Sequence, residues 1–283
     1  MKLATLSAGL VAICSLFAST DAAPASSTTK GDINFTCAYR ISYQLIGYVS
    51  NNDVSGGWAQ CKPSNVGYTA GFARFTTQYG SVLAVVDNYK ESSHYKEEFD
   101  DIYEAIKTAA SDPNSPNAKL DGFCDAWAKA AKNGSYFALS QIVVARKMYE
   151  TPTKAYVKEY KIKFPLTRAA LIYLAMSNGV GETGKTLGAM IKKTNAKFTA
   201  DVTGESGNSL KVGQYSVDEA KWLGALLDET DSAAFAFQSD VLSVFRTLIN
   251  DKQFKLSSTI TFKGLQGKQV KLTCKKLTAS MSK

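Results

Sequence analysis

Apolar residues recur at helical spacing along most of the chain. Cys37, Ile41 and Leu45 are four residues apart, which predicts an amphipathic helix from about residue 32 to Ser50. Residues 166–176 are apolar on every side, so we expect them to form a buried central helix. Similar patterns predict further helices at 82–89, 99–106, 123–130, 137–148 with an extension through 156–160, 216–227 and 235–249.

Two regions have the pattern of short strands rather than helices. After the first helix, Gly, Asn, Ser and Pro cluster at 51–57 and 62–65, which predicts a turn-rich or short-hairpin region. Near the C-terminus, alternating apolar positions on either side of 264–267 predict a terminal β-hairpin. Residues 199–213 are polar and predict a loop that joins two lobes, and Ser216 is predicted to cap the helix after it. The sum is a mainly helical α+β protein.

The first 22 residues have the pattern of a secretory signal peptide. Lys2 precedes an apolar run at 6–17, and small residues stand before residue 23; the run is too short to span a membrane. We expect residues 23–31 to be a flexible linker and residues 32–283 to form one domain. The protein is therefore expected to be secreted and extracellular, without a membrane partner.

Removing that segment leaves four cysteines. An even number in an oxidising compartment predicts two disulfides, and the sequence leaves all three pairings open. No pair has the spacing of metal ligands, so we predict neither a metal nor a cofactor. The four are Cys37, Cys61, Cys124 and Cys274.

The chain has 33 basic and 25 acidic residues, a net charge of +8. A basic chain suggests a polyanionic partner, but the lysines are scattered over amphipathic helices and are expected to form solvated faces. We therefore predict no nucleic-acid partner.

Residues 179–186, with the sequence GVGETGKT, fit the spacing of a phosphate-binding loop. Such a loop needs a parallel sheet whose strand points at the phosphates, and no alternation of strands and helices surrounds this segment. We therefore interpret it as a loop without nucleotide. His94, the only histidine, lies in a charged stretch and is expected to be solvated, which leaves carboxylates as the candidates for hydrolysis.

The run Gly67-Tyr68-Thr69-Ala70-Gly71 resembles that of the chitosanases of glycoside hydrolase family 46. The resemblance continues in the same order through most of residues 35–272. It includes a Gly-Phe and Ala-Trp helix at 122–132, a glycine turn at 178–181 and an Asp-Glu helix at 218–228. It implies a two-lobed, lysozyme-like fold, with a substrate cleft beside the Gly-Tyr-Thr-Ala-Gly run.

The departures from the family fall on the chemistry. Ser50 stands where the resemblance implies the general acid and Ser64 where it implies the general base, while Thr69 matches the threonine that holds the attacking water. Serine cannot replace a carboxyl group in either role at neutral pH. Asp53, three residues past Ser50, is the nearest substitute for the acid; the alternative is a turn residue that bonds its own backbone. The resemblance further implies substrate contacts for Tyr68, Ser81, Asn178 and Asp218.

Two functions follow from the sequence. The family implies endo-hydrolysis of β-1,4-linked glucosamine polysaccharide with inversion, by a monomer that acts on chitosan or a related glycan. The missing carboxylates favour a non-catalytic relative that binds a glycan or a host or cell-wall surface. A basic chain that has lost cleft acids also fits a neutral or anionic glycan better than a polycation.

Overall fold

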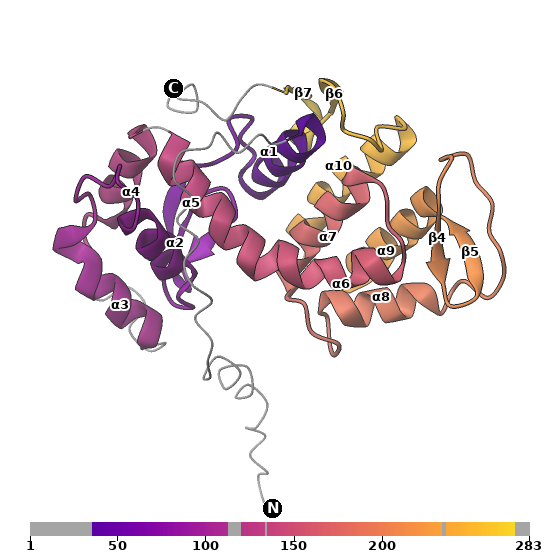
Figure 1. Cartoon of the computed structure of the whole chain (residues 1–283), viewed down its shortest axis with the longest axis horizontal. Coiled ribbons are helices and arrows are strands. Elements are labelled where there is room, and N and C mark those ends of the chain that lie inside the picture. The colour runs from indigo at the N-terminus through magenta and orange to yellow at the C-terminus, as the bar shows by residue number, and fades with distance from the viewer. Residues whose placement is uncertain (1–35, 113–119, 134, 234–235, 275–283) are drawn as a thin grey trace, which may run out of the picture. The chain divides into compact units, whose positions relative to one another are not determined.

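A computed structural model describes residues 36–112, 120–133, 135–233 and 236–274 of the protein. The predicted signal peptide and linker lie outside these residues. Figure 1 shows the arrangement of the elements. The helices are α1 (Cys37–Asn51), α2 (Ser81–Lys90), α3 (Tyr103–Ser111), α4 (Phe123–Lys132), α5 (Ser135–Ala145), α6 (Thr151–Glu159), α7 (Pro165–Asn178), α8 (Leu187–Asn195), α9 (Glu219–Ala233) and α10 (Ala236–Asn250).

The strands among the described residues form small antiparallel sheets. The first sheet confirms the hairpin region expected after the first helix, and the last hairpin confirms the one expected near the C-terminus. The strands are β1 (Cys61–Ser64), β2 (Gly67–Ala70) and β3 (Phe75–Thr76) in the first sheet, β4 (Ser209–Val212) with β5 (Tyr215–Asp218), and β6 (Ile260–Lys263) with β7 (Gln269–Leu272).

The helices α1 and α7 pack against each other in the interior. Thr36 caps α1 by accepting a hydrogen bond from the amide of Tyr39 at 3.3 Å, and Asn52 ends it in a left-handed conformation. Nine consecutive or near-consecutive residues of α7 between Leu166 and Ala175 are buried, which confirms the prediction of a buried central helix. Pro165 starts α7, where its missing amide proton costs no hydrogen bond.

The other helices form two groups, one of which includes α7 (Figure 1). The helices α2 to α5 pack with one another and with the β1–β3 sheet, and α7 to α10 pack with one another and with the β4–β5 hairpin. One nearly continuous helical run joins the groups, made of α5, a π-helical turn (Arg146–Glu150) and α6. The carboxylate of Glu150 in that turn accepts hydrogen bonds from the hydroxyls of Tyr39 and Tyr43, each at 2.9 Å, and so fixes the run to α1.

The region between α8 and α9 corrects two expectations. Residues 199–213 do not form a plain loop, because Ser209–Val212 is strand β4 and pairs with β5. Ser216 lies within β5, and the helix begins at Glu219. Asp218 caps it instead, because its carboxylate accepts the amide proton of Lys221 at 3.0 Å. The polar alternation of β4, which faces solvent on one side, concealed the strand.

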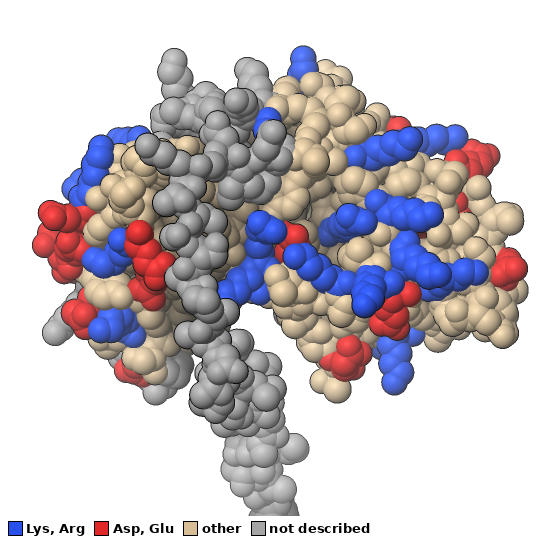
Figure 2. Space-filling model, in the orientation of Figure 1, with Lys and Arg blue, Asp and Glu red and all other residues tan. Residues whose placement is uncertain are grey.

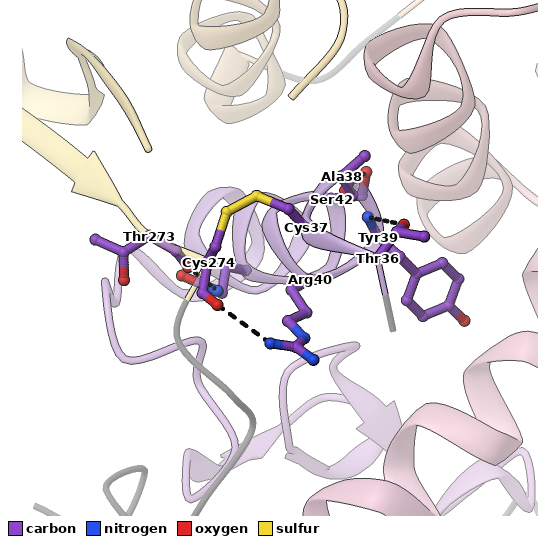
Figure 3. Close-up of a disulfide and its surroundings, with 9 residues drawn as sticks. Thr36, Cys37, Ala38, Tyr39, Arg40, Ser42, Thr273 and Cys274 are labelled. Atoms are coloured by element: carbon purple, nitrogen blue, oxygen red, sulfur yellow. Dashed lines mark hydrogen bonds between the residues drawn. A yellow bond between two sulfur atoms is a disulfide. The ribbon is translucent and has the colours of Figure 1, made fainter. Parts of the chain in front are cut away.

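The four cysteines form Cys37–Cys274 and Cys61–Cys124, which settles the pairing that the sequence left open. The first ties the start of α1 to the chain after β7, where Arg40 also donates to the carbonyl of Cys274 at 3.2 Å (Figure 3). The second joins β1 to α4, across 63 residues of chain.

We predict that replacing Cys61 and Cys124 together by alanine lowers the free energy of unfolding by about 2–4 kcal/mol, because the bridge restricts a long loop of the unfolded chain. Urea denaturation of the variant and the unmodified protein measures the difference. Equal unfolding midpoints and slopes for the two proteins would contradict the prediction.

Candidate functional site

A cleft of about 410 Å³ opens where α1 ends. Its walls come from the end of α1, strands β1 and β2, the turn after β2, the start of α10 and the turn between β6 and β7. The lining residues are Val49, Ser50, Asn51, Asn52, Gln60, Cys61, Lys62, Thr69, Arg74, Asp240, Val241, Leu265 and Gln266.

Thr69 reaches the cleft because of its position in β2. Side chains alternate between the faces of a strand, so Thr69 lines the cleft while Tyr68 packs its ring edge-on against Phe123, with the ring centroids 5.3 Å apart. The hydroxyl of Thr69 donates to the hydroxyl of Ser64 at 3.1 Å. The structure thus joins the expected water-holding threonine to the residue at the expected base position.

The hydroxyl of Ser64 forms hydrogen bonds within its own hairpin. Its hydroxyl donates to the carbonyl of Gly67 at 3.2 Å and accepts the amide proton of Val66 at 3.3 Å, as well as the proton of Thr69. These bonds close the turn between β1 and β2, a common use of serine in turns. The proton of this hydroxyl is thus directed at a backbone carbonyl.

Asn51 and Gln141 hold the Gly-Tyr-Thr-Ala-Gly segment in place. The amide nitrogen of Asn51 donates to the carbonyl of Phe72 at 3.0 Å, which ties the end of α1 to the turn after β2. Gln141 on α5 is fully buried; its oxygen accepts the amide proton of Phe72 at 3.2 Å and its nitrogen donates to the carbonyl of Trp58 at 3.0 Å.

Gly71 is required at this junction. It has a φ of 74°, and a Cβ built there would lie 2.4 Å from the side-chain oxygen of Gln141. Only glycine allows both the left-handed backbone and this approach. The sequence run is therefore a turn held against α5 as well as a wall of the cleft.

Ser50 and Asp53 have different positions. Ser50 lines the cleft from the last turn of α1, as the resemblance implies for the acid position. Asp53 is absent from the lining; its carboxylate accepts the amide proton of Ser55 at 2.8 Å and a proton of the Gln60 side chain at 3.3 Å. Asp53 thus makes the turn that was the structural alternative, and reaches the cleft only through Gln60.

The charges of the cleft come from residues that the sequence analysis did not single out. Lys62 and Arg74 line it from the β1–β3 region, and Asp240 lines it from α10. Asp240 is the single carboxylate among the described lining residues. Nothing in the local sequence marks it, because it lies about 190 residues after Ser50 and only folding brings them together.

Three lining residues have a left-handed backbone conformation, which residues other than glycine rarely adopt. Asn52, Arg74 and Gln266 have φ values of 54°, 53° and 58°. Left-handed conformations of non-glycine residues require support from their surroundings and cluster at functional sites. Asn52 owes its conformation to capping α1, and Glu97, Lys161, Lys252 and Leu256 have positive φ outside the lining, so these conformations do not by themselves mark the cleft.

Four residues with implied substrate contacts lie outside the cleft lining. The ring of Tyr68 points to Phe123, and the buried hydroxyl of Ser81 bonds the backbone of Thr76 at the start of α2. Asp218 is buried and accepts from Ser206 and from Lys221. Asn178 is the last residue of α7. Strand alternation explains the position of Tyr68 and helix capping that of Asp218.

The phosphate-loop pattern forms a closed loop before α8. The amide of Leu187 donates to the carbonyl of Gly179 at 2.9 Å, and that of Gly188 donates to the carbonyl of Gly181 at 3.0 Å. These amides point into the loop, whereas phosphate binding needs amides directed at the ligand. The described residues contain no cluster of His, Cys, Asp and Glu that could hold a metal, and no helix among them is long and apolar enough to cross a membrane.

The sequence model of glycosyl hydrolase family 46 matches residues 57–254, more than half of the chain. The chain belongs to glycosyl hydrolase family 46. The matched segment contains β1, β2 and the start of α10, and so most of the cleft of this family 46 protein.

Known relatives agree with this assignment. A chitosanase of Bacillus subtilis (strain 168) is 28% identical over 176 residues, which are 62% of this chain and 59% of the relative. The match thus spans less than two thirds of that curated relative. The native chitosanase of Bacillus subtilis MY002 superimposes with a TM-score of 0.66 at 22% identity, over 83% of this chain and 98% of that one.

Two further solved structures contain bound sugar. A mutant of the MY002 chitosanase complexed with six glucosamine units matches with a TM-score of 0.67 at 24% identity, over 83% of this chain and 98% of that chain. A chitosanase of Gynuella sunshinyii in complex with chitotetraose matches with a TM-score of 0.66 at 24% identity, over 84% and 98%. These likenesses confirm the lysozyme-like α+β fold.

We predict that Gln141→Leu lowers the free energy of unfolding by about 2–4 kcal/mol, because the amide of Phe72 and the carbonyl of Trp58 each lose a buried partner. Trp127 still donates to the carbonyl of Trp58, so the loss at Phe72 should dominate. Hydrogen exchange of the Phe72 amide, measured with the unfolding free energy, checks this. Unchanged exchange protection at Phe72 would contradict it.

Proposed function

We propose that this family 46 protein binds a glycan in the cleft at the end of α1 and has little hydrolytic activity. The observation that carries the proposal is the pair of hydroxyl groups at the acid and base positions. Ser50 lines the cleft without a carboxyl group, and the hydroxyl of Ser64 is bound within its hairpin. Hydrolysis of a glycosidic bond requires a proton donor and a carboxylate that activates water or attacks the sugar.

The bound ligand is proposed to be an oligosaccharide with a β-1,4-linked glucosamine backbone. The likeness to structures that hold six glucosamine units and chitotetraose supports this class of ligand. Lys62 and Arg74 outnumber Asp240 along the described lining, so N-acetylated, neutral residues suit the cleft better than protonated ones.

Secretion and a monomeric state remain part of the proposal. The signal-like pattern of residues 1–22 supports secretion, and so do the two disulfides, which persist in oxidising compartments. Nothing in the cleft as described needs a residue from a second copy, which agrees with a monomer.

Hydrolysis of chitosan with inversion is the second candidate, and Asp240 is the observation that favours it. Asp240 places one carboxylate in the cleft together with Thr69 and Ser50. The bond between Asp53 and Gln60 puts a second carboxylate beside the lining. Under this candidate, Asp240 and Asp53 would share the roles that the two serines have lost.

Binding is tested by titrating the protein, in a calorimeter, with a glucosamine hexamer and with its fully N-acetylated counterpart. We expect the acetylated hexamer to bind about fivefold more tightly, equivalent to roughly 1 kcal/mol, because it lacks the charge that Lys62 and Arg74 repel. Arg74→Ala should reduce this preference. Absence of binding for both hexamers would overturn the proposal.

Hydrolysis is tested by the release of reducing ends from chitosan and from partially acetylated chitosan. We expect none above a blank without protein. Asp251→Asn, which changes an exposed aspartate outside the cleft lining, is the matched control for variants of the cleft carboxylates. If reducing ends appear and Asp240→Asn lowers their rate by about a hundred- to ten-thousand-fold, the second candidate replaces the first. Asp53→Asn measures the contribution of the other carboxylate.

A further inference from the structure

A second concavity, of about 240 Å³, lies between α6, the loop before α8, and α8 itself. It is separate from the cleft, because the two share no lining residue. We call it the tyrosine pocket. Its lining residues are Tyr156, Glu159, Tyr160, Glu182, Gly188, Ile191, Lys192 and Asn195.

Two aromatic rings form one wall of the tyrosine pocket. Tyr156 and Tyr160 are one helical turn apart on α6, and their ring planes are 7° from parallel with centroids 6.5 Å apart. Burial, as the main cause, and a hydrogen bond with Glu159, as the second, raise the pKa of Tyr160 to about 12. The Tyr160 side chain is therefore neutral at physiological pH. Neutral tyrosine faces attract both sugar rings and organic cations.

Two carboxylates also line the tyrosine pocket. The hydroxyl of Tyr156 donates to one oxygen of Glu182 at 2.8 Å, which holds this carboxylate at the pocket. Glu159 adds a second carboxylate from α6, against the single ammonium group of Lys192. The charge of the described lining is therefore opposite in sign to that of the cleft.

The loop that resembles a phosphate-binding loop builds this wall. A Cβ added to Gly188 would lie 2.6 Å from the Glu182 carboxylate, from the carbonyl of Gly181 and from the hydroxyl of Tyr156. Glycine at 188 therefore allows Glu182 and Tyr156 to meet at the start of α8. Asn195 closes the pocket at the end of α8, where its oxygen accepts the indole proton of Trp222 at 2.8 Å.

The surroundings limit the size of the ligand. Lys and Arg side chains gather over α6 and α8 on the face shown in Figure 2, with a few carboxylates among them. A long polycation would meet these lysines, whereas one residue inside the pocket meets mainly carboxylates and aromatic rings. At physiological salt, charges beyond about 8 Å are largely screened, so the nearest groups decide the preference.

We propose that the tyrosine pocket binds a single protonated amino-sugar residue, with its ammonium group on Glu182 and Glu159 and its ring against Tyr156 and Tyr160. This site is an anchoring point distinct from the cleft and does not require the cleft to bind or hydrolyse anything. A glycan chain that carries both free and acetylated amines could then be held at two places with opposite charge preference.

The experiment is a titration of the ¹⁵N-labelled protein with D-glucosamine, followed by amide chemical shifts. D-glucose and N-acetylglucosamine are the comparison ligands. We expect glucosamine to shift resonances of residues 156–160 and 182–195, and the two uncharged sugars to bind at least about threefold more weakly. Equal affinity for the three sugars, or shifts confined to the cleft residues, would overturn the proposal.

Variants separate the carboxylates from general effects on the fold. Glu159→Gln with Glu182→Gln should weaken glucosamine binding by about tenfold, and Lys192→Ala should strengthen it by about threefold, since it removes the repelling charge. Glu104→Gln, an exposed glutamate on α3, is the matched control and should change nothing. Unchanged affinity in the double variant, with an unchanged melting temperature, would refute the role of the carboxylates.

Failure of this proposal and failure of cleft binding give different results. Arg74 lines the cleft and not the tyrosine pocket, so Arg74→Ala should change hexamer binding and leave the glucosamine shifts at 156–160 as they are. Loss of those shifts in Arg74→Ala would show that the two sites are not separate, and would contradict the assignment.

Discussion

The buried carbonyl of Trp58 determines where the cleft wall stands. It accepts two hydrogen bonds of 3.0 Å from buried donors, the indole of Trp127 on α4 and the side-chain amide of Gln141 on α5. The other end of the same glutamine holds the amide of Phe72, just after β2. One amide side chain thus links α5 to both ends of the segment that carries Thr69. Buried polar groups of this kind rigidify a structure when every member has a partner.

The same demand for partners connects the wall to α1. The side-chain amide of Asn51, at the end of α1, donates a hydrogen bond to the carbonyl of Phe72. The carboxylate of Glu150 accepts hydrogen bonds from the hydroxyls of Tyr39 and Tyr43 on one face of α1. Glu150 lies in the π-helical turn between α5 and α6, where a wider turn interrupts the helix. Such turns are frequent at functional positions. Here the turn brings a carboxylate to α1, so the helix at the cleft and the helical run between the two groups of elements are fixed together.

The cleft and the tyrosine pocket have linings of opposite net charge. A carbohydrate is the proposed ligand of both. The cleft contains Lys62 and Arg74 against Asp240, and the tyrosine pocket contains two glutamates against Lys192. The described cleft lining contains the hydroxyl groups of Ser50 and Thr69, and Asp240 is its one carboxylate. The proposed function, recognition of a sugar chain without efficient cleavage, rests on this lining.

The amino-acid sequence determined most of the helices, two of the hairpin regions and the buried character of α7, because each depends on local periodicity. It did not indicate α8 or the β4–β5 hairpin. Thr69 and Ser50, which the sequence resemblance singled out, both line the cleft. The tertiary structure alone decided the disulfide pairing, because the positions of four cysteines in the sequence do not show which of them lie close together in space. It also turned Tyr68 away from Thr69, used Asp53 for a turn, and capped α9 with Asp218. The cleft position of Asp240 and the tyrosine pocket both depend on elements that are far apart in the sequence. No local pattern in the chain could therefore indicate them.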